Sequence, residues 1–183
     1  MKEAIIRKAE EMFFSRGFQS VTMLAIAQQM GVKPASLYYH FTGGKEEIYL
    51  EVIKSRVKSF KSAIESIAFR ETELETILLE FGYWYVKQPP MNMNLIAEFD
   101  MPHLTPRGRA IAMKSVGEFV FEPLRQLFLK YSGSLRNDLD PYQMVGTFNL
   151  LLYSTKTSAT MSGKKPRELI EYCVSVFLDG VRK

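Results

Sequence analysis

The chain has 183 residues, of which 46% are hydrophobic and 24% charged, and its formal net charge is +4. This length and composition allow a substantial buried core. A membrane span needs about 18 consecutive apolar residues, and no apolar run approaches that length. The start of the chain also lacks the apolar segment of a secretory signal, so we expect a globular cytoplasmic protein without a membrane partner. The single cysteine, Cys173, excludes an intramolecular disulfide, and the two histidines lie too far apart to suggest a metal cluster. We therefore expect no metal and no other cofactor.

Three short helical patterns come first along the chain. The first ends at Gly17, and its apolar face consists of Ala4, Ile5, Ala9, Met12 and Phe13. The second begins at Thr22, whose hydroxyl can cap a helix, and ends at Gly31. The third begins at Pro34, with Leu37 and Phe41 on a buried edge and with Ser36, Tyr39 and His40 on another edge. Two such helices separated by a Gly-Val break are typical of a helix-turn-helix.

The ordered motifs of this region resemble the DNA-binding domain of the TetR/AcrR repressors. The matching residues are Ala9 and Phe13, Gly17, Thr22, Ile26-Ala27, Gly31-Val32, Leu37-Tyr38-Tyr39-His40-Phe41 and Lys45-Glu46. The resemblance implies an all-α fold in which residues 1–46 form a three-helix helix-turn-helix domain. A long helix then joins this domain to an all-helical ligand-binding and dimerisation domain at residues 47–183.

The resemblance also implies which side chains contact DNA. Base edges or the groove are assigned to Lys33, Ala35, Ser36 and Tyr39, and phosphates to Thr22, Tyr38, His40 and Lys45. For Tyr38, partial burial beside Leu37 is the alternative. The third helix has no arginine, so the bidentate reading of guanine by arginine is not available there. We expect sequence recognition to use Lys33, hydroxyl groups, thymine methyl contacts and DNA shape.

The sequence departs from the family pattern in three places. Ala25 stands where the family usually has an acid, so the capping box that would support Thr22 is incomplete. Lys33 replaces the usual small hydroxyl residue before the third helix. Two glycines precede Lys45, which predicts a longer turn and a displaced lysine.

The rest of the chain reads as a series of helices. A long fourth helix is predicted by Ile53, Val57, Phe60, Ile64 and Ile67. A fifth pattern at residues 71–87 ends before Pro89-Pro90, because proline lacks the helical hydrogen-bond donor. A further helix starts at Thr105-Pro106 and runs towards Lys130, and Pro123 is expected to kink or divide it.

Aromatic and methionine residues are frequent between residues 81 and 121. Such side chains can line an adaptable apolar pocket, although helices bury the same residue types as ordinary core. The resemblance implies an inducer pocket in this domain for a small apolar or amphipathic ligand. The candidate ligand-binding residues are Trp84, Tyr85, Phe99, Met101, His103 and Met113. His103 can also be a surface residue of the connection between Pro102 and Pro106.

The last two helical patterns are candidates for an assembly surface. Asp140-Pro141 begins the first, Gly163 ends it, and Pro166 begins the second. Periodicity alone allows both to be plain core, whereas the resemblance implies a four-helix dimer interface. The residues predicted to form it are Phe148, Leu151, Leu152, Thr155, Ala159, Ile170, Val174 and Phe177. A dimer would present two recognition helices to a roughly palindromic double-stranded operator.

The resemblance implies a homodimeric, ligand-responsive transcriptional repressor that a small molecule releases from its operator. The alternative is a helical dimeric binding or interaction protein whose DNA function is lost or independent of ligand. The chain has no Ser-His-Asp order and no glycine-rich phosphate loop. Glu98 and Asp100 are two residues apart and would diverge on a helix, so we do not expect an enzyme.

Overall fold

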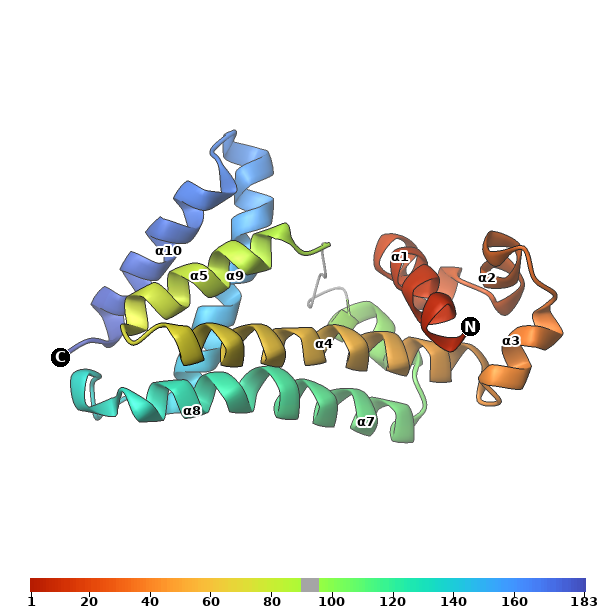
Figure 1. Cartoon of the computed structure of the whole chain (residues 1–183), viewed down its shortest axis with the longest axis horizontal. Coiled ribbons are helices and arrows are strands. Elements are labelled where there is room, and N and C mark those ends of the chain that lie inside the picture. The colour runs from red at the N-terminus through yellow and green to blue at the C-terminus, as the bar shows by residue number, and fades with distance from the viewer. Residues whose placement is uncertain (90–95) are drawn as a thin grey trace. The chain divides into compact units, whose positions relative to one another are not determined.

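The computed structural model describes residues 1–89 and 96–183, and helices dominate both ranges (Figure 1). The α-helices are α1 (Lys2–Ser20), α2 (Met23–Met30), α3 (Pro34–His40), α4 (Gly44–Arg70), α5 (Leu74–Lys87), α7 (Pro106–Val116), α8 (Glu122–Lys130), α9 (Pro141–Ser162) and α10 (Pro166–Val181). The π-helical and 3-10 segments are η1 (Ile96–Asp100), η2 (Met101–His103), η3 (Gly117–Phe121) and η4 (Ser132–Ser134). The predicted all-α class is therefore confirmed. Within the two described ranges, no helix is both long and apolar enough to cross a membrane.

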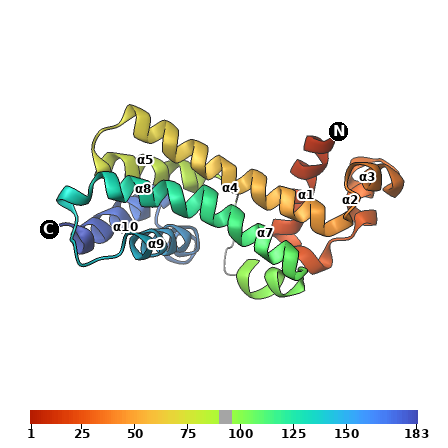
Figure 2. The same cartoon turned by 90° about the horizontal axis from the view of Figure 1, so that it is seen from below.

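The chain forms two compact units that share α4, which Figure 2 shows as one uninterrupted helix. Unit 1 consists of Met1–Val57 together with Met91–Val116, and unit 2 consists of Lys58–Pro90 together with Gly117–Lys183. This grouping differs from the predicted division after residue 46. The connection that carries η1, η2 and α7 belongs with the helix-turn-helix, because its polar side chains bond to α1 and α4.

Glycine, proline and capping residues set where the first helices of unit 1 begin and end. In α1, Gly17 adopts φ 76° and ψ 163°, which interrupts the helix and turns the last residues into a new direction. Thr22 caps α2 by accepting a hydrogen bond from the Ala25 amide at 3.1 Å, and Gly31 ends it at φ 66° in the left-handed region. Pro34 opens α3 as its first residue. These boundaries confirm the predicted helix-turn-helix.

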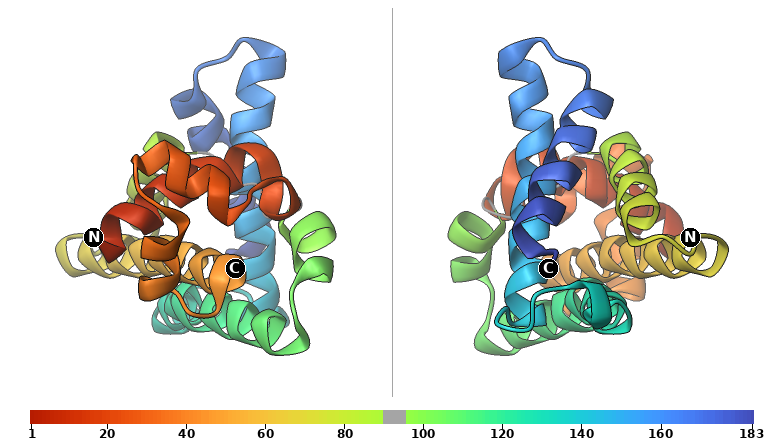
Figure 3. Two further views of the ribbon diagram at one scale, coloured as in Figure 1. Left: turned by 90° about the vertical axis from the view of Figure 1, so that its right-hand side faces the viewer. Right: turned by 90° about the vertical axis from the view of Figure 1, so that its left-hand side faces the viewer.

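Unit 2 is a set of helices packed around aromatic side chains. Helix α10 packs against both α9 and α5, and Figure 3 shows α9 and α10 side by side. Phe148 lies between Phe128 of α8 and Phe177 of α10, with ring centroids 6.4 and 5.2 Å away. Helices α5 and α10 approach closely at Gly82, where an added Cβ would lie 2.5 Å from Cγ2 of Ile170. A side chain at this glycine would force the two helices apart.

The later helix boundaries also follow the sequence signals. Pro123 lies in the first turn of α8, directly after the π-helical turn η3, so the predicted long helix is divided there. Asp140 caps α9 by accepting a hydrogen bond from the Tyr142 amide at 2.6 Å. Gly163 ends α9 at φ 68°, and Pro166 begins α10.

Candidate DNA-binding site

Two buried side chains set the orientation of α3. Leu37 and Phe41 are fully buried, which anchors one edge of the helix in unit 1. The turn before α3 is fixed by backbone bonds from the Gly31 and Val32 amides to the carbonyl oxygens at the end of α2. The helix is therefore held on one side by the core and presents its opposite side outward.

The outward side of α3 carries the residues predicted to read DNA. Lys33, Ala35, Ser36 and Tyr39 are all exposed, and 83% of the Tyr39 surface is accessible. Hydroxyl groups, an ammonium group and a methyl group are thus displayed together on seven residues of chain. This set can donate hydrogen bonds to base acceptors and contact thymine methyl groups in a major groove.

The residues predicted to contact phosphate have different surroundings. Tyr38 and Thr22 are exposed, and His40 is half-buried with its ring 5.2 Å from that of Tyr39 in an edge-on arrangement. Half of the Tyr38 surface is exposed. Thr22 also lies at the N-terminus of α2, where helix amides favour a phosphate oxygen.

Lys45 points into unit 1. Its ammonium donates a hydrogen bond to the Phe18 carbonyl oxygen at 2.9 Å and lies 4.2 Å from the centre of the Phe18 ring. Burial lowers the pKa of Lys45, and the nearby charge of Asp100 partly offsets this effect. Phosphate contact by Lys45 stays a prediction that would require the side chain to leave these partners.

Asp100 is a structural residue of this site that the sequence did not reveal. The residue is only 3% exposed. One carboxylate oxygen accepts a hydrogen bond from the Phe18 amide at 2.8 Å, and the other accepts one from the Tyr49 hydroxyl at 2.7 Å. Asp100 thus joins η1 to the turn after Gly17 and to α4. No sequence signal identifies these pairs, which are separated by 82 and 51 positions.

Glu46 provides a second connection between α4 and the segment that follows η1. Its carboxylate accepts hydrogen bonds from the Thr105 amide at 3.1 Å and the Thr105 hydroxyl at 2.6 Å. Gly108 lies in the next turn, and an added Cβ there would collide with the Glu46 carboxylate. The start of α7 is therefore fixed to the start of α4.

Arg56 connects α4 to α1 in the interior of unit 1. Its guanidinium lies 3.0 Å from the Glu10 carboxylate, and its side chain is almost completely buried. The same guanidinium is 5.8 Å from the centre of the Phe14 ring. This ion pair helps to hold α1 against α4.

Because of the Tyr49 hydroxyl, we expect the folded protein to lose stability at alkaline pH. Burial, the hydrogen bond to Asp100 and the charge of Asp100 all raise the pKa of Tyr49 above its usual value near 10. Its folded state thus holds the proton more tightly than the unfolded state, so its stabilisation is present below pH 10 and is lost above it. We expect Tyr49→Phe to reduce the fall in unfolding free energy above pH 10 by up to about 1.4 kcal/mol per pH unit. Urea titrations at pH 8 and pH 11 measure this, with Tyr39→Phe as the exposed control; equal slopes for all three proteins would contradict it.

The predicted ligand-binding residues are divided between the two units. Trp84 and Tyr85 belong to unit 2, where their rings lie 5.3 and 5.9 Å from that of Phe60. The other four belong to unit 1: Phe99, His103 and Met113 are exposed, and Met101 is half-buried. Unit 2 therefore contains the ring cluster from which a ligand site can be built.

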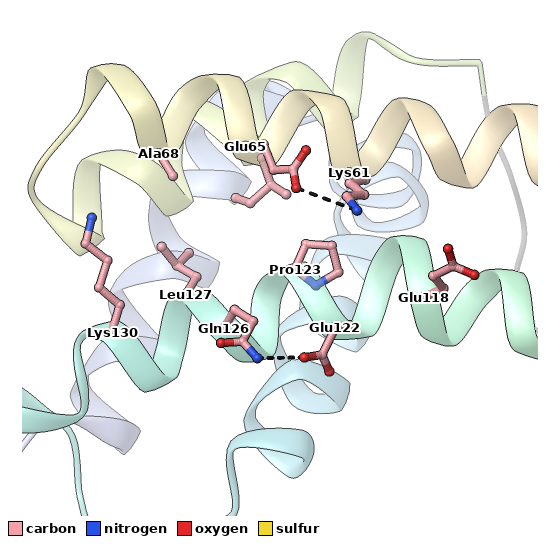
Figure 4. Close-up of a pocket in the computed structure, with 10 residues that line it drawn as sticks. Lys61, Glu65, Ala68, Glu118, Glu122, Pro123, Gln126, Leu127 and Lys130 are labelled. Atoms are coloured by element: carbon pink, nitrogen blue, oxygen red, sulfur yellow. Dashed lines mark hydrogen bonds and ion pairs between the residues drawn. The ribbon is translucent and has the colours of Figure 1, made fainter.

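A groove of about 310 Å³ lies between α4 and α8 in unit 2 (Figure 4). Apolar side chains such as Ile64 and Leu127 line it together with charged residues. Lys61 pairs with Glu65 across 3.8 Å, and Gln126 donates a hydrogen bond to Glu122 at 2.7 Å. The members of these two polar pairs therefore satisfy one another.

The residues predicted to form a dimer interface lie mostly inside unit 2. Buried in its own core are Phe148, Leu152, Thr155, Ile170, Val174 and Phe177, whereas Leu151 and Ala159 are half-buried. Other faces of α9 and α10 expose Leu150, Tyr172 and Val176. A groove of about 360 Å³ between these helices is lined in part by Leu151 and Val176. The buried members of the predicted set are therefore already packed within the protomer.

The helix-turn-helix corresponds to a known family. The family described as bacterial regulatory proteins, tetR family, matches residues 5–52, which cover α1 to α3 and the start of α4. Residues 5–52 therefore match the DNA-binding domain of the TetR family. The match confirms the resemblance predicted from the sequence for this region.

Related regulatory proteins match the N-terminal part of the chain. Over 77 residues it is 30% identical to the HTH-type transcriptional regulator UidR of Escherichia coli K12, covering 40% of this chain and 39% of UidR. Over 55 residues it is 38% identical to IcaR of Staphylococcus epidermidis, a negative transcriptional regulator of the biofilm operon icaADBC. That match covers 30% of this chain and 29% of IcaR. The chain therefore aligns with well under half the length of these relatives.

Solved structures extend the similarity of fold to the remaining helices. Reduced NemR of E. coli has a TM-score of 0.77 at 16% identity, over 100% of this chain and 97% of NemR. The fatty acid degradation regulator FadR of Bacillus halodurans has a TM-score of 0.78 at 18% identity, over 98% and 95%. A putative regulator from Saccharomonospora viridis in complex with choline has a TM-score of 0.73 at 15% identity, over 100% and 97%. These identities show a common fold and nothing more specific.

Proposed function

We propose that this protein is a homodimeric transcriptional repressor of the TetR family that binds a roughly palindromic operator and is released by a small molecule. The observation that carries the DNA-binding part is the exposed face of α3, with Tyr39, Ser36 and Lys33 displayed beside a buried Leu37. IcaR, a relative in the DNA-binding region, is a negative regulator, which supports repression. The choline complex of a protein with the same fold supports a small-molecule effector.

The order of segments along the chain connects ligand binding in unit 2 with the conformation of the DNA-binding helices. The segment Met91–Val116 follows one part of unit 2 and precedes another, yet it belongs to unit 1. Asp100 and Thr105 hold its described part to α1 and α4. A ligand that prefers one conformation of unit 2 would shift the population of the DNA-binding helices through this segment and through α4. Operator and ligand must then weaken each other's binding by the same factor.

The experiment is fluorescence anisotropy with DNA from the promoter region beside the gene and with a scrambled duplex, over a series of salt concentrations. We expect a preference of at least about 10³ for the promoter DNA, and a steep fall of affinity as salt increases. Weak and equal binding to both duplexes would be followed by unbiased selection from random DNA. If selection also returned no preferred sequence, the alternative of a helical binding protein without DNA function would replace this proposal.

Tyr39→Ala tests the position of the recognition helix. Because Tyr39 is largely exposed, we expect an unchanged melting temperature and a loss of about 10-fold in operator affinity. Phe69→Ala is the matched control, since Phe69 is a similarly exposed aromatic residue of unit 2. Equal operator affinities for both variants would show that α3 does not read the DNA.

A further inference from the structure

The start of α4, where the resemblance places the phosphate contact of Lys45, is occupied by intramolecular hydrogen bonds. Lys45 donates to the Phe18 carbonyl oxygen at 2.9 Å and to the Gln19 carbonyl oxygen at 3.5 Å. Glu47 accepts a hydrogen bond from the Gly43 amide at 2.8 Å, so a carboxylate already lies beside the helix start that would favour a phosphate. A DNA phosphate bound here would have to displace these contacts and approach a negative charge.

A network of contacts holds Lys45 in its inward orientation. Its ammonium lies 4.2 Å from the centre of the Phe18 ring, and the Phe18 amide donates a hydrogen bond to Asp100 at 2.8 Å. Burial lowers the pKa of Lys45 and the charge of Asp100 opposes this effect, so the ammonium and the carboxylate attract each other. The peptide of Phe18 is therefore held on its carbonyl side by Lys45 and on its amide side by Asp100.

A different lysine lies at the C-terminal end of α3. Lys2 belongs to the first turn of α1, and its ammonium is 4.9 Å from the centre of the Phe41 ring. Phe41 follows His40, the last residue of α3, so the start of α1 lies beside the end of the recognition helix (Figures 1 and 2). Lys2 is exposed, and none of the ion pairs within residues 1–89 and 96–183 includes it.

The ring contact positions the Lys2 ammonium and leaves its charge available to an anion. Phe41 is fully buried, so its ring is a fixed support in unit 1. An aromatic face attracts an ammonium electrostatically, whereas the three N–H donors of the ammonium can still bond to an oxygen. Lys2 thus lies next to His40, which the resemblance assigns to phosphate. Phosphate contacts of this kind fix the register of a recognition helix on the duplex.

We propose that Lys2 contacts the operator phosphate beside the C-terminal end of α3, in place of Lys45. The inference rests on the proposed function, and it assigns the DNA backbone contact to the start of α1 instead of the start of α4. Lys45 then serves as a structural residue that holds the turn after Gly17. Because the contact of Lys2 is with phosphate, it adds affinity and salt dependence without adding sequence preference.

Salt titrations of operator affinity distinguish the two lysines. The probe is the duplex that the wild type prefers, and fluorescence anisotropy is measured between about 50 and 300 mM potassium chloride. Each lost phosphate contact reduces the steepness of log affinity against log salt by about 0.9, and the proposed dimer loses two contacts per substitution. We expect Lys2→Met to reduce the steepness by about 1.8 and the affinity at about 100 mM salt by about 10-fold or more. Its preference over a scrambled duplex should stay unchanged, and Lys45→Met should keep the wild-type steepness.

Further variants separate charge from packing. Lys2→Arg keeps the positive charge and should retain the wild-type salt dependence, whereas Lys2→Met keeps only an apolar chain against Phe41. Lys8→Met is the matched control, because Lys8 belongs to the same helix and pairs with Glu11 at 2.8 Å. It should leave the salt dependence unchanged. Circular dichroism and urea titration would confirm that each variant is folded, above all Lys45→Met, which loses intramolecular hydrogen bonds.

A wild-type salt dependence in Lys2→Met would overturn the inference. A steepness reduced by about 1.8 in Lys45→Met would also overturn it, because Lys45 would then leave its partners to bind phosphate. A lower sequence preference in Lys2→Met would show that Lys2 reads bases instead. If the wild type prefers its operator and Lys2→Met keeps the full salt dependence, only this inference fails. A wild type without affinity for any duplex would reject the proposed function as well.

Discussion

Replacement of Asp100 by alanine is expected to destabilise the protein by about 4 kcal/mol, which corresponds to a fall of about 10 °C in melting temperature. The substitution removes a buried carboxylate and leaves the Phe18 amide and the Tyr49 hydroxyl without their acceptor. Each unsatisfied buried group costs about 1 to 3 kcal/mol, and the lost charge-assisted hydrogen bonds add to this. Differential scanning calorimetry and urea titration measure the change.

Two variants separate the parts of this effect. Tyr49→Phe removes one of the two hydrogen bonds and keeps the carboxylate, so it should cost less, about 1.5 kcal/mol. Glu98→Ala replaces an exposed acid in the same η1 segment and should be nearly neutral. A loss below about 1 kcal/mol for Asp100→Ala would mean that water or a neighbouring side chain satisfies both donors, and that η1 does not hold the helix-turn-helix.

Loss of Asp100 is also expected to change how operator affinity responds to ligand. The segment that contains η1 belongs to unit 1, and through Asp100 it fixes the direction of the chain after Gly17. Loss of this contact would free the end of α1 from the segment that leads back to unit 2. In the proposed repressor, operator affinity would then fall less on addition of ligand, even at temperatures where Asp100→Ala is folded.

Features that depend on neighbouring residues in the chain were predicted from the sequence. The N-cap at Thr22, the left-handed Gly31 and the prolines that open α3, α9 and α10 each act within one helical turn. Leu37 and Phe41 were assigned to a buried edge from spacing alone, and both are fully buried. The exposure of the DNA-reading residues follows from that same edge.

Features that depend on distant residues were not predictable in this way. In the sequence, Asp100 stands out only as a possible acid two residues after Glu98. Its position gives no indication that it bonds to the Phe18 amide or the Tyr49 hydroxyl. The family pattern assigned Lys45 to phosphate, and the extra glycine at the turn into α4 suggested a displaced lysine. Its actual partner, the Phe18 carbonyl oxygen, is brought near by the turn at Gly17. Such pairings follow from tertiary packing, which periodicity does not encode.

The two C-terminal helices show a different limit of periodicity. A helix that packs both within its own protomer and against a second copy needs two apolar stripes. Spacing alone does not tell which stripe faces the core and which faces the second copy. The prediction chose the stripe with Phe148, Leu152 and Phe177, which the structure places in the core of unit 2. The exposed stripe is weaker in sequence, because polar residues interrupt it around Leu150 and Val176.

Charged substitutions in the exposed stripe of α9 and α10 are expected to disrupt the proposed dimer. Leu150 is 63% exposed on α9 and Val176 is 45% exposed on α10, and neither packs fully within the protomer. If the proposed dimer uses this face, the double variant Leu150→Asp and Val176→Asp places four carboxylates in one apolar interface. We expect a monomer of normal helix content, measured by analytical ultracentrifugation and circular dichroism. Its operator affinity should fall by about 10² to 10⁴, because two recognition helices no longer bind as one unit.

Two controls distinguish a lost interface from a damaged protomer. Phe69→Asp introduces a charge at a side chain that is 91% exposed on α4, and it should leave both the dimer and operator binding unchanged. Phe148→Ala removes a ring from the core of unit 2 and should cost about 3 to 5 kcal/mol of protomer stability. A double variant that stays dimeric would exclude this face from the interface. A double variant that becomes monomeric yet keeps full operator affinity would show that one recognition helix is enough, and the expectation of a palindromic operator would then be wrong.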